Sequence, residues 1–348
     1  MNVSIIDPFA DNRWAELVAR HPKASVFHEP GWIQALVQTY GYRPLVLTST
    51  RRGLPLVDGL IFCRVSSWVT GTRLVSLPFA DHCEPLLCDG GQGETIRTFA
   101  NWLEGECDRK KLKYIELRTK SETDDADRLH SGQSYYLHTL DLTRPLRQIF
   151  EALHRDCVQR RIRRAERACL SYETGDNDQL LNEFYSLWTM TRRRHRLVPQ
   201  PRNWFRNLIR CMSKKVQIRL ARREGVAIAA ILTLVHRSSV VYKYGCSEAR
   251  YHNLGGMPFL FWKLIEESKA AGAQEIDFGR SDLDNQGLIT FKDRFGTRKK
   301  LITYIRYPEA GTLGATSRWT VQAIRDLFSI MPDALLPTVG RVLYRHIG

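Results

Sequence analysis

The sequence predicts an α/β (α+β) protein of two tandem lobes, each with a mixed, mostly antiparallel sheet flanked by helices. The chain has 348 residues, enough for two ordinary domains, and its 43% hydrophobic and 26% charged residues are typical of a globular protein. Strand-like and helix-like patterns alternate clearly in the second half. The first half repeats the same order in a weaker form, which indicates a duplication.

The elements of the second half can be predicted in order. A helical pattern opens near Pro145, and its apolar positions are Ile149, Phe150, Leu153, Ile162 and Ala165. We then expect a strand at 170–174, helices at 177–194 and 202–213, strands at 216–223, 226–236 and 239–247, a helix at 257–271, a strand at 274–279, a short helix around 291–292 and a strand at 300–308. Gly272 is a typical stop signal for the helix at 257–271.

The first half holds a matching helix–strand unit. Residues 98–118 resemble residues 259–279, and Trp102 aligns with Trp262. Ile115 aligns with Ile276 at nearly the same offset. Near-equal offsets within one unit favour a duplicated domain over two unrelated ones.

We therefore divide the chain into a first lobe at 1–144, a second lobe at 145–308 and a tail at 309–348. The tail mixes large apolar residues with arginines, so it is amphipathic and basic. Such a segment either packs on the first lobe or lies on a membrane surface.

Two triplets of a protein kinase signature occur, His-Arg-Asp at 154–156 and Asp-Phe-Gly at 277–279. A kinase requires an asparagine where Arg161 stands, a short distance between the triplets and a glycine-rich loop before them. These parts are missing, so the kinase interpretation is excluded.

The eight cysteines are scattered without a C-x-x-C pair, which favours free thiols in a reducing compartment and no metal site. We expect no secretory signal and no membrane-spanning segment, because the start lacks a basic apolar leader and no apolar run is long enough. The predicted location is cytoplasmic, with peripheral contact at the inner face of the membrane left open.

The formal net charge is +15, and arginines concentrate at 155–167 and 192–196. These clusters are either solvated helix faces or a surface for phosphates of a nucleotide, a tRNA or an anionic lipid. No DNA-binding motif is present, so DNA is not an expected partner.

The order of the predicted elements resembles that of the GNAT (N-acetyltransferase) fold. In that fold a loop before a helix wraps the pyrophosphate of the acyl donor, and segment 250–256 stands at this place. The resemblance implies that Arg250, Gly255 and Gly256 bind the donor. Two residues more than in the usual R/Q-x-x-G-x-G/A pattern separate the arginine from the glycines, and the alternative is that the segment is a plain turn leading into the helix.

Several segments further resemble the Fem-like (FemAB-related) acyl and aminoacyl transferases, which carry a doubled GNAT fold. They are 74–87, 160–173, 240–249, 275–282 and 287–296. The resemblance covers nearly the whole chain. The second lobe of this chain lacks the long helical hairpin that some members use around tRNA. Some members add amino acids to peptidoglycan precursors, and broader relatives accompany cell-envelope and exopolysaccharide genes.

The resemblance implies a set of site residues. The catalytic candidates are Lys292, Tyr242 and Asp81, and the substrate-binding candidates are Arg280, Tyr244, Arg194 and Phe291. Because Tyr242 and Tyr244 lie two apart on a strand, we expect both on one face, either at the site or as a core pair. Asp277 is expected to hold the N–H groups of the loop behind its strand. No metal is expected.

The sequence thus predicts an N-acyltransferase that acts on an amine of a cell-envelope or exopolysaccharide precursor. The alternative is an aminoacyl-tRNA-dependent transferase adding an amino acid to a peptidoglycan-type precursor, and the second alternative is a non-catalytic adaptor for nucleic acid or membrane. No bound cofactor is expected. The co-substrate is acyl-CoA or aminoacyl-tRNA, and the acceptor is a phosphate-bearing sugar or a lipid-linked molecule.

Overall fold

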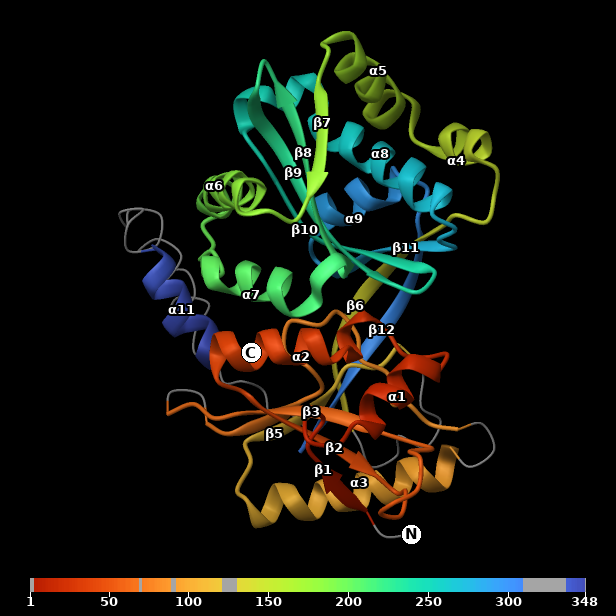
Figure 1. Cartoon of the computed structure of the whole chain (residues 1–348), viewed down its shortest axis with the longest axis vertical. Coiled ribbons are helices and arrows are strands. Elements are labelled where there is room, and N and C mark those ends of the chain that lie inside the picture. Colours follow the sequence, from red (N-terminus) through yellow and green to blue (C-terminus); the bar gives the residue numbers. More distant parts are fainter. Residues whose placement is uncertain (1–2, 69–70, 89–91, 121–129, 309–335, 348) are drawn as a thin grey trace. The chain divides into compact units, whose positions relative to one another are not determined.

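The computed structural model describes residues 3–68, 71–88, 92–120, 130–308 and 336–347, and Figure 1 shows the elements that they form. The chain divides into two compact units. Unit 1 comprises Met1–Ser134, Ile302–Val321 and Thr338–Gly348, and unit 2 comprises Tyr135–Leu301 and Gln322–Pro337. Strands β6 (His130–Asp141) and β12 (Arg298–Tyr307) contribute residues to both units. The predicted boundary between residues 144 and 145 falls just after β6.

Unit 1 is built on a sheet with the strand order β1-β2-β3-β4-β5-β12-β6. Strands β4 and β5 are parallel, whereas β1, β2, β3 and β4 pair in antiparallel fashion along the sheet, as do β5 and β12. Its elements are β1 (Ser4–Ile6), α1 (Arg13–Arg20), η1 (Val26–His28), α2 (Pro30–Tyr40), β2 (Arg43–Thr48), β3 (Leu60–Val65), β4 (Arg73–Val75), α3 (Gln92–Arg109) and β5 (Tyr114–Leu117).

The core of unit 1 forms between this sheet and α3. Phe99 and Leu103 of α3 pack with Leu47, Phe62 and Ile115 from three strands. These side chains recur at helical spacing in α3 and at alternate positions in the strands, which is the pattern that lets one face of each element become buried.

Unit 2 is built on the strand order β6-β11-β10-β9-β8-β7, in which only the pair β10 and β11 is parallel. Its helices are α4 (Leu146–Ala152), η3 (Arg155–Gln159), α5 (Arg160–Arg167), α6 (Asp178–Arg194), α7 (Arg202–Met212), η4 (Ser213–Lys215), η5 (Ala249–Leu254), α8 (Gly256–Ala270) and α9 (Gln286–Asp293). Its strands besides β6 are β7 (Ser171–Gly175), β8 (Val216–Arg223), β9 (Val226–His236), β10 (Ser239–Ser247) and β11 (Glu275–Asp282).

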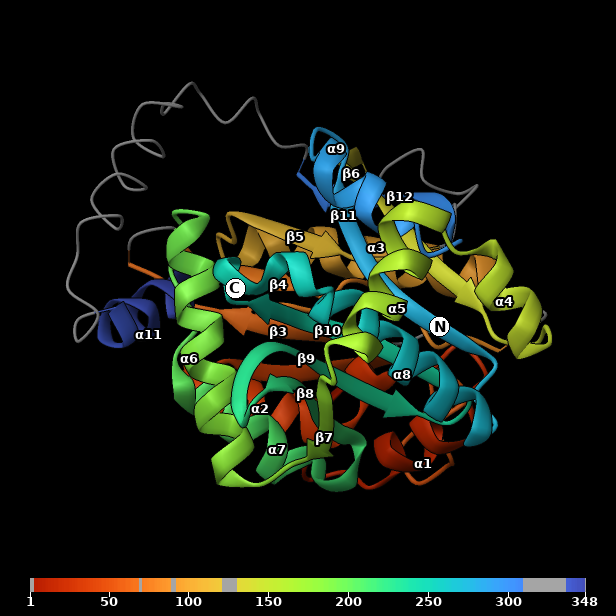
Figure 2. The same ribbon diagram turned by 90° about the horizontal axis from the view of Figure 1, so that it is seen from above.

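Helices cover both faces of the sheet of unit 2. Helices α5 and α8 lie on one face and α6 and α7 on the other, as Figures 1 and 2 show. On the α8 face, Phe261 stacks on Phe278 of β11 with ring centroids 5.0 Å apart. On the α6 face, Trp188 and Phe205 pack together. The site described below forms on the α8 face.

The two units share one topology, which confirms the predicted two-lobed α/β fold. In unit 1 three antiparallel strands (β2, β3, β4) lead through α3 to β5, which lies parallel to β4. In unit 2 three antiparallel strands (β8, β9, β10) lead through α8 to β11, which lies parallel to β10. Trp102 and Trp262, aligned in the sequence, lie in the equivalent helices α3 and α8.

The prediction of one continuous helix from near Pro145 through Ala165 is wrong. Helix α4 ends at Ala152, and Leu153 adopts an extended conformation. The backbone N–H of His154 donates to the carbonyl of Arg294 (2.8 Å) rather than continuing α4. The side chain of Gln159 then caps α4 by donating to the carbonyl of Leu153 (2.8 Å). Apolar spacing is similar on both sides of the break, so periodicity did not reveal it.

Within the tail, residues 309–335 lie outside the described part of the chain. The described residues 336–347 form helix α11 (Leu336–Ile347). Tyr344 and His346 of α11 contact other residues of unit 1, and the carbonyl of Tyr344 accepts a hydrogen bond from the Tyr42 hydroxyl (2.6 Å). None of the described helices is long and apolar enough to cross a membrane.

Candidate functional site

Strands β10 and β11 are paired only near their beginnings. The paired positions end at Val241 and Asp277, although β10 continues to Ser247 and β11 to Asp282. Parallel strands that separate in this way open a gap on the sheet, which side chains or a ligand can fill. The cavity described below is lined by Ser247, at the end of β10 beyond the paired positions.

A bulge on β11 accompanies the separation. The pairing of β11 with β6 changes register between Asp277 and Arg280, where Gly279 has a φ of +71°. The buried Asp277 carboxylate accepts the N–H of Gly279 (2.6 Å), as expected from the sequence. The Lys292 ammonium donates to the carbonyls of Gly279 (2.9 Å) and Arg280 (2.8 Å). A carboxylate and an ammonium therefore hold the same bulge.

Lys292, the leading catalytic candidate of the sequence, is almost completely buried, with 2% of its surface exposed. Its ammonium is directed at backbone carbonyls of β11, so its visible role is to fix the strand. Ionised groups in protein interiors are retained where such hydrogen bonds compensate for lost hydration.

A buried histidine adjoins this lysine. His138 of β6 has no exposed surface, and its Nδ1 lies 3.5 Å from a carboxylate oxygen of Asp293 on α9. Burial, reinforced by the positive charge of Lys292, lowers the pKa of His138 to about 4. The imidazole is therefore neutral near pH 7.

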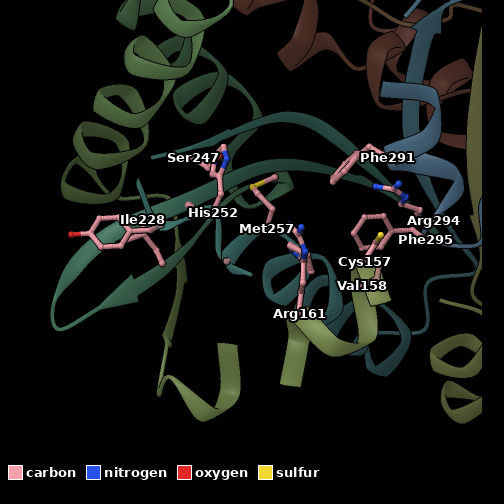
Figure 3. Close-up of a pocket in the computed structure, with 14 residues that line it drawn as sticks. Cys157, Val158, Arg161, Ile228, Ser247, His252, Met257, Phe291, Arg294 and Phe295 are labelled. Carbon is pink, nitrogen blue, oxygen red and sulfur yellow. The ribbon is translucent and has the colours of Figure 1, made fainter. Parts of the chain in front are cut away.

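A cavity of about 280 Å³ is lined by η3, α5, η5, the start of α8 and the end of α9 with the turn that follows it, and β9 and the end of β10 complete its wall (Figure 3). Apolar side chains form most of its wall, and Arg161, His252 and Arg294 bring positive or polar groups to it. The lining residues are Cys157, Val158, Arg161, Ile228, Ala229, Ser247, Tyr251, His252, Gly256, Met257, Pro258, Phe291, Arg294 and Phe295. A mostly apolar cleft with a few polar groups is the usual form of a small-molecule site.

Two glycines bring the N-terminus of α8 to this cavity. Gly255 has a φ of +80°, and a Cβ there would lie 2.4 Å from the carbonyl oxygen of Arg161. A Cβ on Gly256 would lie 3.1 Å from the Cβ of Ala229. Only glycine permits the conformation and close contact at residue 255. The first-turn N–H groups of a helix lack partners within the helix and attract anions. At the cavity wall α8 offers those of Gly256 and Met257, since Pro258 has no N–H.

A polar cluster lies at the η5 end of the cavity. The Ser247 hydroxyl and His252 Nε2 are 2.9 Å apart, and Arg194 donates to the carbonyl of Ser247 (2.9 Å). Partial burial and the nearby charges of Arg194 and Arg161 lower the pKa of His252. The predicted substrate-binding residue Arg194 therefore contacts the cavity wall through Ser247.

Tyr242 is adjacent to the cavity. Its hydroxyl lies over Gly245, because a Cβ at that glycine would be 2.1 Å from the phenolic oxygen and 3.1 Å from the end of Met257. Met257 in turn lines the cavity. Burial raises the pKa of Tyr242, so the phenol keeps its proton at neutral pH.

The expectation that Tyr242 and Tyr244 share a face is wrong. The pairing of β10 with β9 shifts register between them, and this bulge reverses the alternation of side chains. Tyr242 packs on Phe261 of α8, whereas Tyr244 packs on Trp188 of α6. The Tyr244 hydroxyl accepts hydrogen bonds from Trp204 (2.8 Å) and is buried in that opposite core.

The other predicted residues take different positions. Phe291 lines the cavity. Arg280 lies over the ring of Tyr135, with its guanidinium carbon 3.9 Å from the ring centre. Arg250 is exposed and forms an ion pair with Glu248 (3.4 Å). Gly255 and Gly256 lie beside the cavity, whereas Arg250 does not line it.

Asp81 belongs to unit 1. Its backbone carbonyl accepts a hydrogen bond from the hydroxyl of Tyr304 (2.8 Å), which orders the loop after β4. Among the described residues, no group of three or more metal-binding side chains is found.

Several lining residues were not predicted, among them Arg161, His252, Met257, Arg294 and Phe295. Arg161 lay in a cluster interpreted as a whole, and no pattern separated the arginine that faces the cavity from those that face away. In the sequence, Met257 and Phe295 fit the pattern of ordinary buried apolar positions. Only the spacing of His252 from Gly255 offered a signal, since both lie in the loop at the start of α8.

Comparisons with known proteins identify the class of the fold. Residues 152–292 match the model of the acetyltransferase (GNAT) domain family. The crystal structure of FemX superposes with a TM-score of 0.69 at 13% identity, covering 88% of this chain and 97% of that one. A comparison with curated proteins found no match.

Two further structures show the same likeness. The C-terminal domain of a putative lysylphosphatidylglycerol synthetase from Agrobacterium fabrum gives a TM-score of 0.54 at 14% identity, covering 85% of this chain and 90% of that one. A tandem GNAT protein from the clavulanic acid biosynthesis pathway gives a TM-score of 0.52 at 12% identity, covering 88% of this chain and 98% of that one.

The fold is therefore that of a GNAT acyltransferase. More particularly, the chain has the Fem-like doubled GNAT fold, as the sequence resemblance indicated.

Proposed function

We propose that the protein is an N-acyltransferase that moves an acyl group from a donor held in the cavity of unit 2 to an amine of a cell-envelope precursor. The observation that carries the proposal is the mostly apolar cavity of unit 2, to whose wall the N-terminus of α8 and Arg161 both contribute. Its apolar wall suits the flexible arm of an activated donor, and the α8 terminus with Arg161 suits the phosphates of that donor.

The chemistry requires few groups. The amine attacks the donor carbonyl, a tetrahedral oxyanion forms, and the carbon–sulfur or carbon–oxygen bond of the donor then breaks. Correct placement and stabilisation of the oxyanion supply most of the acceleration. In our proposal the attacking amine loses one proton and the leaving thiolate or alkoxide gains one, and the phenol of Tyr242 relays it by giving up its own proton as it takes the proton of the amine. Burial raises the pKa of Tyr242, so the phenol is protonated at neutral pH before and after the transfer.

Lys292 acts in this proposal as a positioning residue. Its two hydrogen bonds hold α9 to the β11 bulge and thereby position the α9 side of the donor cavity. Phe291, its neighbour on α9, contributes to the cavity wall. Arg194, Arg280 and Asp81 remain candidates for binding the acceptor or its phosphate.

We favour acyl-CoA as the donor, because two tightly placed glycines at a helix N-terminus suit a pyrophosphate. A second candidate, aminoacyl-tRNA, is favoured by the exposed arginines of α5, Arg160, Arg163, Arg164 and Arg167, which form a shallow surface groove with Glu166. The names of two neighbours, FemX and a putative lysylphosphatidylglycerol synthetase, support an acceptor at the cell envelope. The expected location is the cytoplasm, with contact at the inner face of the membrane.

The first test measures, by calorimetry, how CoA and bulk tRNA compete for the purified protein at near-physiological salt. We expect saturable CoA binding that tRNA does not displace. The variant Met257→Trp fills the cavity and should weaken CoA binding at least about tenfold. Met190→Trp, at a methionine with 40% of its surface exposed, is the matched control and should bind CoA normally.

Other outcomes would redirect the assignment. Tight tRNA binding without CoA binding would favour the aminoacyl-tRNA-dependent transferase. Salt-dependent RNA or membrane binding, with no acyl transfer to any amine tested, would favour the non-catalytic adaptor.

A further inference from the structure

The turn after β3 carries an unusually exposed aromatic side chain. Trp68 has 88% of its surface exposed, the highest value among the large hydrophobic residues of the described chain. The other tryptophans with a described burial class, apart from the half-buried Trp102, are buried. An indole kept in water requires an explanation, because tryptophan gains much free energy from burial.

Ser67, which precedes Trp68, is held by hydrogen bonds on both its backbone and its side chain. The N–H of Gly71 donates to the carbonyl of Ser67 (2.9 Å), and the Ser67 hydroxyl lies 3.0 Å from His346 Nδ1 of α11. Arg73 donates to the carbonyl of His346 (2.7 Å). The rings of Trp68 and His346 meet edge to face, with centroids 5.8 Å apart. Trp68 is therefore supported from one side by the C-terminal helix and open on the other.

Positive charges flank this exposed ring. Arg345, next to His346 on α11, is exposed, and so is Lys113 on the other side of the turn. The Lys113 side chain lies against Gly71, and its backbone N–H donates to the carbonyl of Thr72 (2.8 Å). Helix α11 contains no acidic residue. The exposed Val342 of α11 adds a second apolar side chain.

This combination fits one kind of partner. Tryptophan prefers the boundary between water and lipid, where its ring is apolar and its N–H remains hydrated. Lysine and arginine beside it interact with anionic headgroups. One indole, one valine and flanking cations are too small a surface for a stable protein interface, and they suit a weak, reversible contact in which apolar insertion and attraction to anionic headgroups act together.

We propose that the Trp68 turn and the end of α11 form a docking surface for a membrane that contains anionic lipids. The inference rests on the proposed role at the cell envelope but not on the transfer chemistry. It assigns the membrane contact to unit 1, where Trp68, Lys113, Arg345 and His346 all lie. The surface would place the enzyme near a lipid-linked acceptor.

The test is cosedimentation with vesicles of equal parts phosphatidylglycerol and phosphatidylcholine, compared with pure phosphatidylcholine. We expect binding to the anionic vesicles that weakens as salt increases. Trp68→Ala should lower the affinity roughly tenfold, and Lys113→Glu and Arg345→Glu several-fold each. Matched controls are Val226→Ala, at a valine with 57% of its surface exposed, and Lys214→Glu, at an exposed lysine; both lie in unit 2 and should bind normally.

A spectroscopic readout locates the contact. Brominated lipids quench a tryptophan that enters the bilayer interface, so the wild type should be quenched and Trp68→Phe should lose that quenching. Equal vesicle binding by Trp68→Ala and the wild type would overturn the proposal, as would equal losses in Lys214→Glu and Lys113→Glu. Transfer to a water-soluble amine is measured separately, so its failure beside intact vesicle binding would count only against the transferase assignment.

Discussion

At the scale of single residues, the hydrogen bonds of Lys292 bear on how its predicted role can be tested. The sequence resemblance places this lysine at the active site, whereas its ammonium bonds to two carbonyls of β11. If Lys292 acts by positioning β11, its loss should alter the shape of the donor site, and hence donor binding, more than the reaction of the bound donor.

The variant Lys292→Met should therefore change donor binding more than turnover. Losing both hydrogen bonds leaves two buried carbonyls without these donors, at a cost of roughly 1–3 kcal/mol in unfolding free energy. We expect the KM for the donor to rise about tenfold, with a smaller change in kcat, in steady-state kinetics. Lys214→Met, at an exposed lysine, is the control. Abolished turnover with normal donor binding would instead make Lys292 a catalytic residue.

His138 gives unit 2 a dependence on pH. Its folded pKa, about 4, is below the ordinary value of 6.5, so the unfolded chain takes up a proton first as the pH falls. The free energy of unfolding is not reduced by His138 above about pH 6.5, and it decreases as the pH falls from there toward 4. Between pH 7 and pH 5 the loss should be about 2 kcal/mol.

Urea unfolding at these two pH values measures this effect. The variant His138→Asn should lose about 2 kcal/mol less than the wild type over the interval, because all other titrating groups are common to both proteins. An equal pH dependence in the two proteins would show that His138 is protonated with its ordinary pKa in the folded state.

At the scale of elements, the entry to α8 depends on one backbone approach. Gly255 and Gly225 both have a φ near +80°, but a Cβ at Gly225 would meet no atom within 4 Å, whereas one at Gly255 would collide with the carbonyl of Arg161. The two positions thus separate backbone strain from steric contact.

Gly225→Ala should cost about 1 kcal/mol of stability and leave donor binding unchanged, because only the backbone conformation is penalised. Gly255→Ala should cost clearly more and weaken CoA binding, since α5 or the start of α8 must move. Thermal unfolding and calorimetry of the two variants check this. Similar results for both would mean that the contact with Arg161 relaxes without affecting the cavity.

Most elements could be predicted from the sequence because hydrophobic periodicity reports which face of a helix or strand is buried. Helix α6, predicted at 177–194, occupies Asp178–Arg194. The bulges could not be predicted, since a single extra residue leaves the apolar pattern nearly intact while reversing the side chains beyond it. Tyr244 was misplaced for this reason.

At the scale of the whole molecule, the doubled fold was predictable because duplication leaves a record at two places in the sequence. The candidate site was predictable only in part. Gly255, Gly256 and Phe291 were named from the resemblance, and they border the cavity. Cys157 and Val158 belong to η3 and Phe295 to the turn after α9, and only tertiary packing brings them together.

The sharing of β6 and β12 between the units also determines when each can be completed during synthesis on the ribosome. Strand β5 emerges early, but its partner β12 ends at Tyr307, near the end of the chain. Until β12 has been synthesised, the edge of β5 in the nascent first unit has no partner strand, and an exposed strand edge promotes aggregation. Slow translation or a chaperone acting before residue 307 would thus affect the yield of this protein more than that of a chain whose lobes close one after the other.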